Sequence, residues 1–253
     1  MTLRWIVAAL LAAVSLSAEA QVVWTEPPFP SSDDQVTLYY DAAQGNGELS
    51  GVIPVYIHTG LITSASSSPN DWQYVNMPWA STDPEWVMDY VGTDLWSYDF
   101  GGQTIADFFG LPGNVTAEQL AMVFRNGSGT AVGRDTDGGD IFLPLSDGSF
   151  SAVFLQPQSD NALSVLGEGI VLQATATEAA ALSFISNGDT LASALNAVQL
   201  SHVFDPENPG TYNIEFHADN GSNSAVVTTE VLVLPGSSNT APAPAGTQDG
   251  LNP

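Results

Sequence analysis

The chain has 253 residues and is strongly acidic, with 3 Lys and Arg residues in all against 28 Asp and Glu residues, a formal net charge of −25. This charge repels phosphate backbones and anionic lipid, which argues against nucleic acid and membrane surfaces as partners, whereas a neutral polymer is not repelled. Because the sequence contains no cysteine, the fold must be held by packing rather than by disulfides.

The first twenty residues have the pattern of a secretory signal peptide. Arg4 precedes an apolar run from Trp5 to Val14, and the small-residue site Ala18-Glu19-Ala20 follows. The run is shorter than the roughly 20 apolar residues that a membrane-spanning helix requires. We therefore expect residues 1–20 to be removed, so that the mature protein begins at Gln21 and is secreted or held at the cell surface.

Short β-branched and aromatic runs separated by Gly and Pro predict an all-β chain. In the first half, strands are expected at Gln35–Tyr40, Val52–His58, Trp72–Val75, Leu95–Phe100, Leu120–Arg125 and Ile141–Leu145. One short helix is predicted over Thr104–Phe109, because its apolar residues have helical spacing and Gly110 and Pro112 end it.

The sequence changes in character after Ser146-Asp147-Gly148, where aromatic residues become sparse. Strands are expected there at Ala152–Gln156, Ile170–Thr177, Ala181–Ser186, Val198–Phe204, Thr211–His217 and Ala225–Leu234, with Asn187-Gly188 as a hairpin turn. This spacing is typical of a small β-sandwich. We therefore predict two β-sandwich (immunoglobulin-like) domains in tandem, over residues 21–146 and 147–235, and a Gly/Ser/Asn/Pro/Ala-rich linker over 236–253.

Aromatic side chains gather in one part of the first predicted domain. Tyr56 and His58 alternate on one expected strand, Trp72 and Tyr74 alternate on the next, and Trp79 follows. Side by side, two such strands would form an aromatic platform with an imidazole at its edge. Sugar rings stack on exposed aromatic faces, which favours a glycan site. Periodicity alone, however, favours the alternative that these rings fill the core.

Several ordered blocks add to this reading. Val55–His58, Asp71-Trp72 and Met122–Gly129 resemble the starch-binding carbohydrate-binding modules of families 25 and 26. The layout is closer still to the amino-terminal module of α-amylases from Bacteroidetes and related bacteria. In that group these blocks recur with others like Pro27–Pro30, Tyr56–Gly60, Phe124–Asn126 and Gly138–Phe142.

The resemblance covers about Gln21 to Leu145 and implies binding of starch or a related α-glucan. It implies that Tyr56, His58 and Trp72 contact glucose units, with Tyr74 and Trp79 as weaker candidates. The sequence departs from the family in the long insertion Leu61–Asn70 between the histidine and tryptophan blocks.

Other chemistry is less well supported. His58 could in principle be a general base or a metal ligand, but its fellow histidines His202 and His217 lie in the other predicted domain. Asp135, Asp137 and Asp140 alternate beside glycines, as in a calcium loop. The distal Glu of such a loop is missing, so an Asp-rich hairpin turn is the favoured interpretation and no cofactor is expected.

Motifs for catalysis are also missing from the sequence: it has no Gly-x-Ser-x-Gly, no His-Glu-x-x-His and no phosphate loop. We therefore expect a non-catalytic chain. The resemblance implies that it is the α-glucan-binding front part of a secreted α-amylase, since a step like Ala245–Gly250 opens the segment before the family 13 catalytic region in those enzymes. The alternative is a free-standing surface glycan-binding or adhesion protein.

Overall fold

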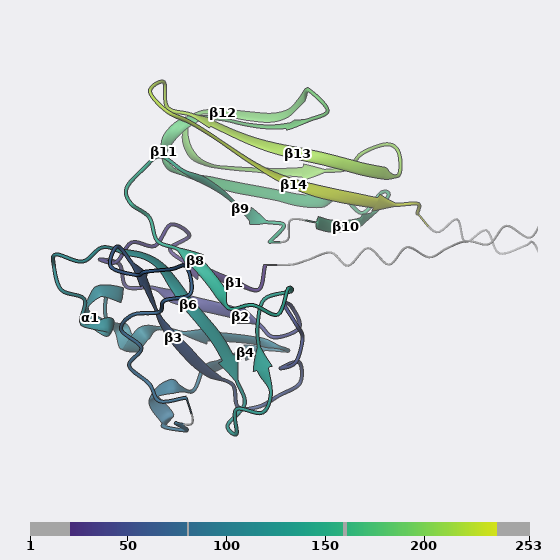
Figure 1. Cartoon of the computed structure of the whole chain (residues 1–253). Coiled ribbons are helices and arrows are strands. Elements are labelled where there is room, and N and C mark those ends of the chain that lie inside the picture. Colours follow the sequence, from purple (N-terminus) through teal and green to yellow (C-terminus); the bar gives the residue numbers. More distant parts are fainter. Residues whose placement is uncertain (1–20, 80, 159–160, 237–253) are drawn as a thin grey trace, which may run out of the picture.

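The computed structural model describes residues 21–79, 81–158 and 161–236, and shows two β-sandwich modules in tandem (Figure 1). The predicted all-β fold class is thereby confirmed. The predicted signal peptide and residues 237–253 of the predicted linker lie outside the described residues. Within the part of the chain that the structure describes, no helix is long and apolar enough to cross a membrane.

The first module consists of two antiparallel sheets. One has the order β1-β2-β5-β4, formed by β1 (Val23–Glu26), β2 (Thr37–Asp41), β5 (Leu95–Tyr98) and β4 (Asp89–Gly92). In the other, β6 (Ala117–Arg125) lies beside β3 (Tyr56–Thr63) and pairs on its other edge with β7 (Val132–Gly133) and β8 (Ile141–Pro144). Two 3-10 helices, Pro84–Trp86 and Phe100–Gly102, and helix α1 (Ile105–Phe109) lie in the connections.

Side chains between the two sheets form the first core. Leu38 and Tyr40 of β2 face Ile57 of β3 and Phe124 of β6, and all four are fully buried. The ring of Tyr40 stacks on that of Phe124, with centroids 3.7 Å apart and planes at 14°. Alternation along the strands therefore sends one set of residues inward and leaves the other set on the outer faces of the sandwich.

The predicted helix is confirmed as α1. Its N-cap residue Thr104 accepts a hydrogen bond at Oγ1 from the backbone amide of Asp107, and Gly110 ends it in the left-handed conformation at φ 64°. These are the start and stop signals expected from the sequence.

The second module is formed by β9 (Ala152–Gln156), β10 (Asn161–Val165), β11 (Ile170–Ser186), β12 (Asp189–Phe204), β13 (Gly210–Asp219) and β14 (Ser224–Leu234). Strand β11 pairs with β12 along one edge, and on its other edge first with β9 and then with β13. Strand β10 pairs with β14 in parallel. Phe154 of β9 lies 5.9 Å from Phe184 of β11 and 6.3 Å from Phe216 of β13, between ring centroids, so β9 closes the second core.

Most predicted strands are present, but several boundaries differ. The two strands expected at 170–177 and 181–186 are one long strand, β11, with register shifts between Thr175 and Leu182 that let it bend. The strand expected over Val52–His58 begins only at Tyr56 and continues to Thr63. Strands β1, β4, β7 and β10 have no counterpart among the predicted ones. The first core draws on residues up to Leu145, and Phe150 packs on the second, so we keep residues 146 and 147 as the proposed boundary.

The strand expected over Trp72–Val75 is wrong. Only Gln73 makes an isolated bridge, to Leu61 of β3, and Tyr74 has a φ of 55°, outside the β region. The segment pairs with the free edge of β3 at this one residue and does not continue as a strand. This arrangement determines how the predicted site residues meet.

Candidate functional site

The outer faces of β3 and its neighbour β6 are contacted by residues 72–79 and 81, which we call the covering segment. Ile57 and Leu61 point into the core, so Tyr56, His58 and Gly60 share the opposite face of the strand. On the neighbouring strand β6, Arg125 pairs with Tyr56 and Val123 pairs with His58. The covering segment contacts Gly60 and His58 of this face, and it bonds Arg125 beside Tyr56.

At Gly60 the covering segment pairs with the free edge of the strand, and Trp72 and Val75 lie over the glycine. The backbone amide of Gln73 donates to the carbonyl of Leu61 at 2.7 Å, and Leu61 donates back at 2.9 Å. A Cβ atom added to Gly60 would lie 2.7 Å from Cγ2 of Val75, 3.0 Å from the carbonyl oxygen of Gln73 and 3.5 Å from Cε3 of Trp72. A residue without a side chain is therefore required beneath Trp72.

Gly60→Ala is expected to push the segment at Gln73 away from β3 and to displace the Trp72 indole. Because the obstacle includes backbone at 3.0 Å, we expect a loss of about 1–3 kcal/mol in the free energy of unfolding, the usual cost of overpacking. Urea unfolding measures this loss, and Gly92→Ala, where an added Cβ meets nothing within 4 Å, is the control. Equal free energies of unfolding for Gly60→Ala and Gly92→Ala would contradict this prediction, because the segment would then move aside without cost.

His58 lies between two indoles. Its ring centroid is 5.9 Å from that of Trp72, at an interplanar angle of 30°, and 5.0 Å from that of Trp79, at 86°. Nδ1 of His58 and Nε1 of Trp72 are both buried without a hydrogen-bond partner. The Trp79 side of this cluster is open, since Trp79 is 40% exposed. The three residues form one aromatic surface, which we call the Trp79 face.

Burial lowers the pKa of His58, and the charge of Arg125 lowers it further, while Asp140 acts in the opposite direction. The folded-state pKa therefore lies below the value of about 6.5 for an unfolded chain. His58 is neutral near pH 7, where an imidazole can both donate and accept a hydrogen bond.

The same shift predicts a pH dependence of stability. As the pH falls below about 6.5 the unfolded chain takes up a proton at His58 that the folded chain resists, so stability is lost in this window. His58→Gln removes that loss. The difference in Tm between the unmodified chain and His58→Gln should therefore be smaller at pH 5 than at pH 7.5 by calorimetry. A constant difference would contradict the shift.

Arg125 ties the covering segment to the sheet. Its side chain is fully buried, and its guanidinium donates to the carbonyl oxygens of Ser81 and, at 3.1 Å, Asn126. Its Cζ lies 5.0 Å from the ring centroid of Tyr56 and 5.9 Å from that of Trp79. Backbone carbonyls and aromatic faces thus hold the guanidinium, although its Nε is buried without a hydrogen-bond partner, and it fixes the stretch that carries Trp79.

A polar turn follows Arg125 and borders Trp79. Oδ1 of Asn126 accepts from the amide of Thr130 at 3.0 Å, and the hydroxyls of Ser128 and Thr130 lie 2.8 Å apart. Gly129 packs on the indole so closely that an added Cβ would lie 3.0 Å from Nε1 of Trp79. The exposed residues Ser128 and Thr130 and the half-buried Asn126 therefore stand next to an exposed indole.

The structure separates the predicted site residues into two groups. His58, Trp72 and Trp79 come together in the Trp79 face. Tyr56 lies beneath Arg125 and is only 8% exposed, and Tyr74 packs against the first core. The expected two-strand platform is therefore replaced by a strand residue and two loop indoles, because the segment with Trp72 and Tyr74 is not a strand.

The acidic loop is a tight turn. The amide of Gly138 donates to the carbonyl of Asp135 at 2.9 Å, Asp137 accepts from the amide of Gly139 at 2.7 Å, and Asp140 forms an ion pair with Arg134 at 2.6 Å. Among the described residues, no group of three or more acidic or histidine side chains is placed to hold a metal ion. Asp135, Asp137 and Asp140 therefore gain no support as calcium ligands.

No protein-family model matches the chain, and no curated protein sequence matches it either. Solved structures with a similar arrangement include the fibronectin(III)-like modules of Clostridium thermocellum CbhA, at 17% identity and a TM-score of 0.29, over 35% of this chain and 99% of that one.

Two further structures align over most of the chain. The D0-D1 domain of Intimin matches at 9% identity and a TM-score of 0.31, over 84% of this chain and 98% of that one. Bacteroides ovatus SGBP-B of a mixed-linkage glucan utilization locus, solved with a mixed-linkage heptasaccharide, matches at 10% identity and a TM-score of 0.29, over 82% of this chain and 43% of that one.

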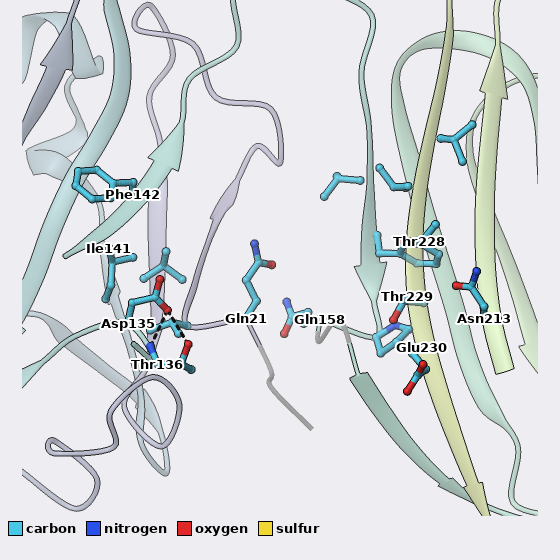
Figure 2. A pocket seen from close by; sticks show the side chains of 17 residues that line it. Gln21, Asp135, Thr136, Ile141, Phe142, Gln158, Asn213, Thr228, Thr229 and Glu230 are labelled. Carbon is cyan, nitrogen blue, oxygen red and sulfur yellow. Dashed lines mark hydrogen bonds between the residues drawn. The ribbon is translucent and has the colours of Figure 1, made fainter. Parts of the chain in front are cut away.

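A separate hollow of about 750 Å³ lies between the two modules. Figure 2 shows Asp135, Thr136, Ile141 and Phe142 of the first module on one side and Asn213, Thr228, Thr229 and Glu230 of the second on the other, with Gln21 and Gln158 between them. The backbone amide of Gln21 donates to the carbonyl of Gln158 at 2.7 Å. This hollow does not include the Trp79 face.

Sequence reasoning did not assign a role to Arg125, Gly129 or Asn126. A signal was available for Arg125, since it follows the apolar run Leu120–Phe124 and is one of only three cations in the chain. A lone cation at the end of a buried strand indicates a structural bond of the kind found here. Gly129 and Asn126 belong to the block Met122–Gly129 that carries the resemblance, but nothing in the block assigned them a role.

Proposed function

We propose that the chain binds neutral polysaccharide at the Trp79 face. The observation that carries this proposal is that an indole 40% exposed stands edge-on to His58 at 5.0 Å between centroids, next to the polar groups of Asn126, Ser128 and Thr130. An exposed aromatic ring stacks on the apolar face of a sugar, and neighbouring hydroxyl and amide groups bond its hydroxyls.

The charge of the protein supports a neutral ligand. A formal net charge of −25 disfavours anionic glycans. Arg125, the cation nearest this face, is fully buried and bonded to backbone carbonyls, so it offers no site to a carboxylate or sulfate. Hydroxyl-rich, uncharged sugar chains remain as the ligand class that suits the face.

Within this class we propose α-glucan, with the chain as the non-catalytic, starch-binding part of a secreted α-amylase. The support is the resemblance of residues 21–145 to amino-terminal modules of such enzymes. Binding would hold a catalytic domain close to its polymer and raise the local concentration of substrate, even though each sugar contact is weak.

Affinity electrophoresis tests the ligand class. We expect slower migration of the chain in native gels containing amylopectin or glycogen than in gels without polysaccharide. Slower migration in mixed-linkage β-glucan alone would overturn the α-glucan assignment and favour a surface glycan-binding protein of another specificity. Unchanged migration in every gel would overturn carbohydrate binding.

A further inference from the structure

A second pair of aromatic rings lies on the opposite outer face of the first module. In β1 and β2, Val23 and Leu38 point into the core and are buried. Trp24 and Tyr39, which pair across the two strands, therefore point outward. This face belongs to the sheet β1-β2-β5-β4, whereas His58 belongs to the sheet that contains β3 and β6.

The two rings are nearly parallel. Their centroids are 5.5 Å apart and their planes meet at 11°, and both side chains are half-buried. The hydroxyl of Tyr39 donates to Oε2 of Glu26 at 3.2 Å, and Ser97 is the outward neighbour of Tyr39 on β5. Aromatic ring surface and polar groups therefore lie side by side on this outer face, which is not part of the first core.

Trp24 also lines a groove of about 430 Å³, within the range of about 300–1,000 Å³ that is usual for ligand pockets. Phe29 lies on the same side of it, and Phe154 of the second module contributes from the other. The groove's polar lining includes the hydroxyls of Ser149 and Ser151. Trp24 and Phe29 are therefore the aromatic residues of the groove on the first module, and the ring of Phe154 also packs in the second core.

We propose that Trp24 and Tyr39, with this groove, form a second binding site for neutral glycan. This inference rests on the proposed function, because it assigns the same ligand class to both faces. Each ring stacks on the other by one face, so a sugar unit would lie against the ring surface that remains exposed. Glu26 and Asp147 at the border can accept bonds from sugar hydroxyls and repel anionic ligands.

The placement of the two sites has a consequence for polymers. The sites lie on the outer faces of opposite sheets, with the core between them, so a short oligosaccharide fills one site at a time. A long or branched glucan can engage both, and such double attachment holds a polymer more firmly than either site alone. The second site therefore adds more to retention on amylopectin than to affinity for a short sugar.

Isothermal titration of the full chain with maltoheptaose, paired with affinity electrophoresis in amylopectin, tests this inference. We expect two sugars per chain for the unmodified protein and one for Trp24→Ala, for Tyr39→Ala and for Ser97→Arg, which blocks the face without removing either ring. Trp79→Ala should also leave one, and Trp24→Ala combined with Trp79→Ala none. Circular dichroism confirms that each variant is folded.

The outcomes separate the two proposals. The unmodified chain could bind one sugar, with this binding lost in Trp79→Ala and unchanged in Trp24→Ala, Tyr39→Ala and Ser97→Arg. That result would overturn the second site and keep the proposed function. A stoichiometry of one lost only in the face variants would support the face and overturn the Trp79 site. No binding in the unmodified chain would overturn both, and self-association lost in Trp24→Ala would show that the face binds a second copy instead.

Discussion

Trp79→Ala is expected to weaken binding of the glucan at the Trp79 face by about thirtyfold, which corresponds to about 2 kcal/mol for loss of a central aromatic contact. The indole is 40% exposed and contacts His58 by its edge, so its removal takes away stacking surface without opening the core. The unfolding temperature should fall only slightly. Titration with maltoheptaose measures the affinity, and calorimetry measures the stability.

Tyr90→Ala is the matched control for this prediction. Tyr90 is an aromatic residue 56% exposed on β4, and it contacts Trp96 with centroids 5.2 Å apart, away from the Trp79 face. We expect its removal to leave affinity unchanged. Equal affinity of Trp79→Ala and the unmodified chain, with both folded, would show that sugar does not rest on this indole.

Arg125→Met is expected to have the second large effect. The substitution leaves the carbonyl oxygens of Ser81 and Asn126 without their donor, and each buried polar group left unpaired costs about 1–3 kcal/mol. The stretch with Trp79 is then no longer fixed to β6, so we expect at least a tenfold loss of affinity together with lower stability in urea. Arg125 acts here by positioning Trp79, without touching the sugar itself.

Arg134→Met separates positioning from charge. It removes the other arginine of the predicted mature chain, which forms a partly exposed ion pair with Asp140, and such pairs contribute about 0–1 kcal/mol. Affinity should be kept in Arg134→Met. Arg125→Lys should restore affinity only in part, because an ammonium lacks the fork of donors that reaches two carbonyls. Normal affinity in Arg125→Met would contradict the positioning role.

Helix α1 and one hairpin turn could be predicted from the sequence, whereas strand β10 could not. Thr104, Gly110 and the helical spacing between them predicted α1, and Asn187-Gly188 predicted the turn where both residues have positive φ. Strand β10 was not predictable, because it pairs in parallel with β14, far along the chain, and short strands of this kind have little local pattern of their own.

The site was predicted in its residue types more than in its geometry. Alternation places Tyr56 and His58 on one face of β3, but it cannot tell whether another segment covers that face. The covering segment leaves Trp79 open and buries Tyr56 under Arg125. Gly60 was the one local sign that the segment at Gln73 approaches β3, since glycine inside a strand often marks close approach of another backbone.

If sugar rests on Trp79, the NMR signal of the Trp79 indole N–H should shift when sugar binds. Trp24, Trp72, Trp79, Trp86 and Trp96 each give one such NMR signal in the predicted mature protein, and Trp86 and Trp96, at 8% and 2% exposed, serve as internal references in the core. Titration with maltoheptaose should shift the Trp79 signal, with a smaller shift for Trp72, and leave the two references in place. A Trp79 signal that stays fixed at saturating sugar would contradict the account.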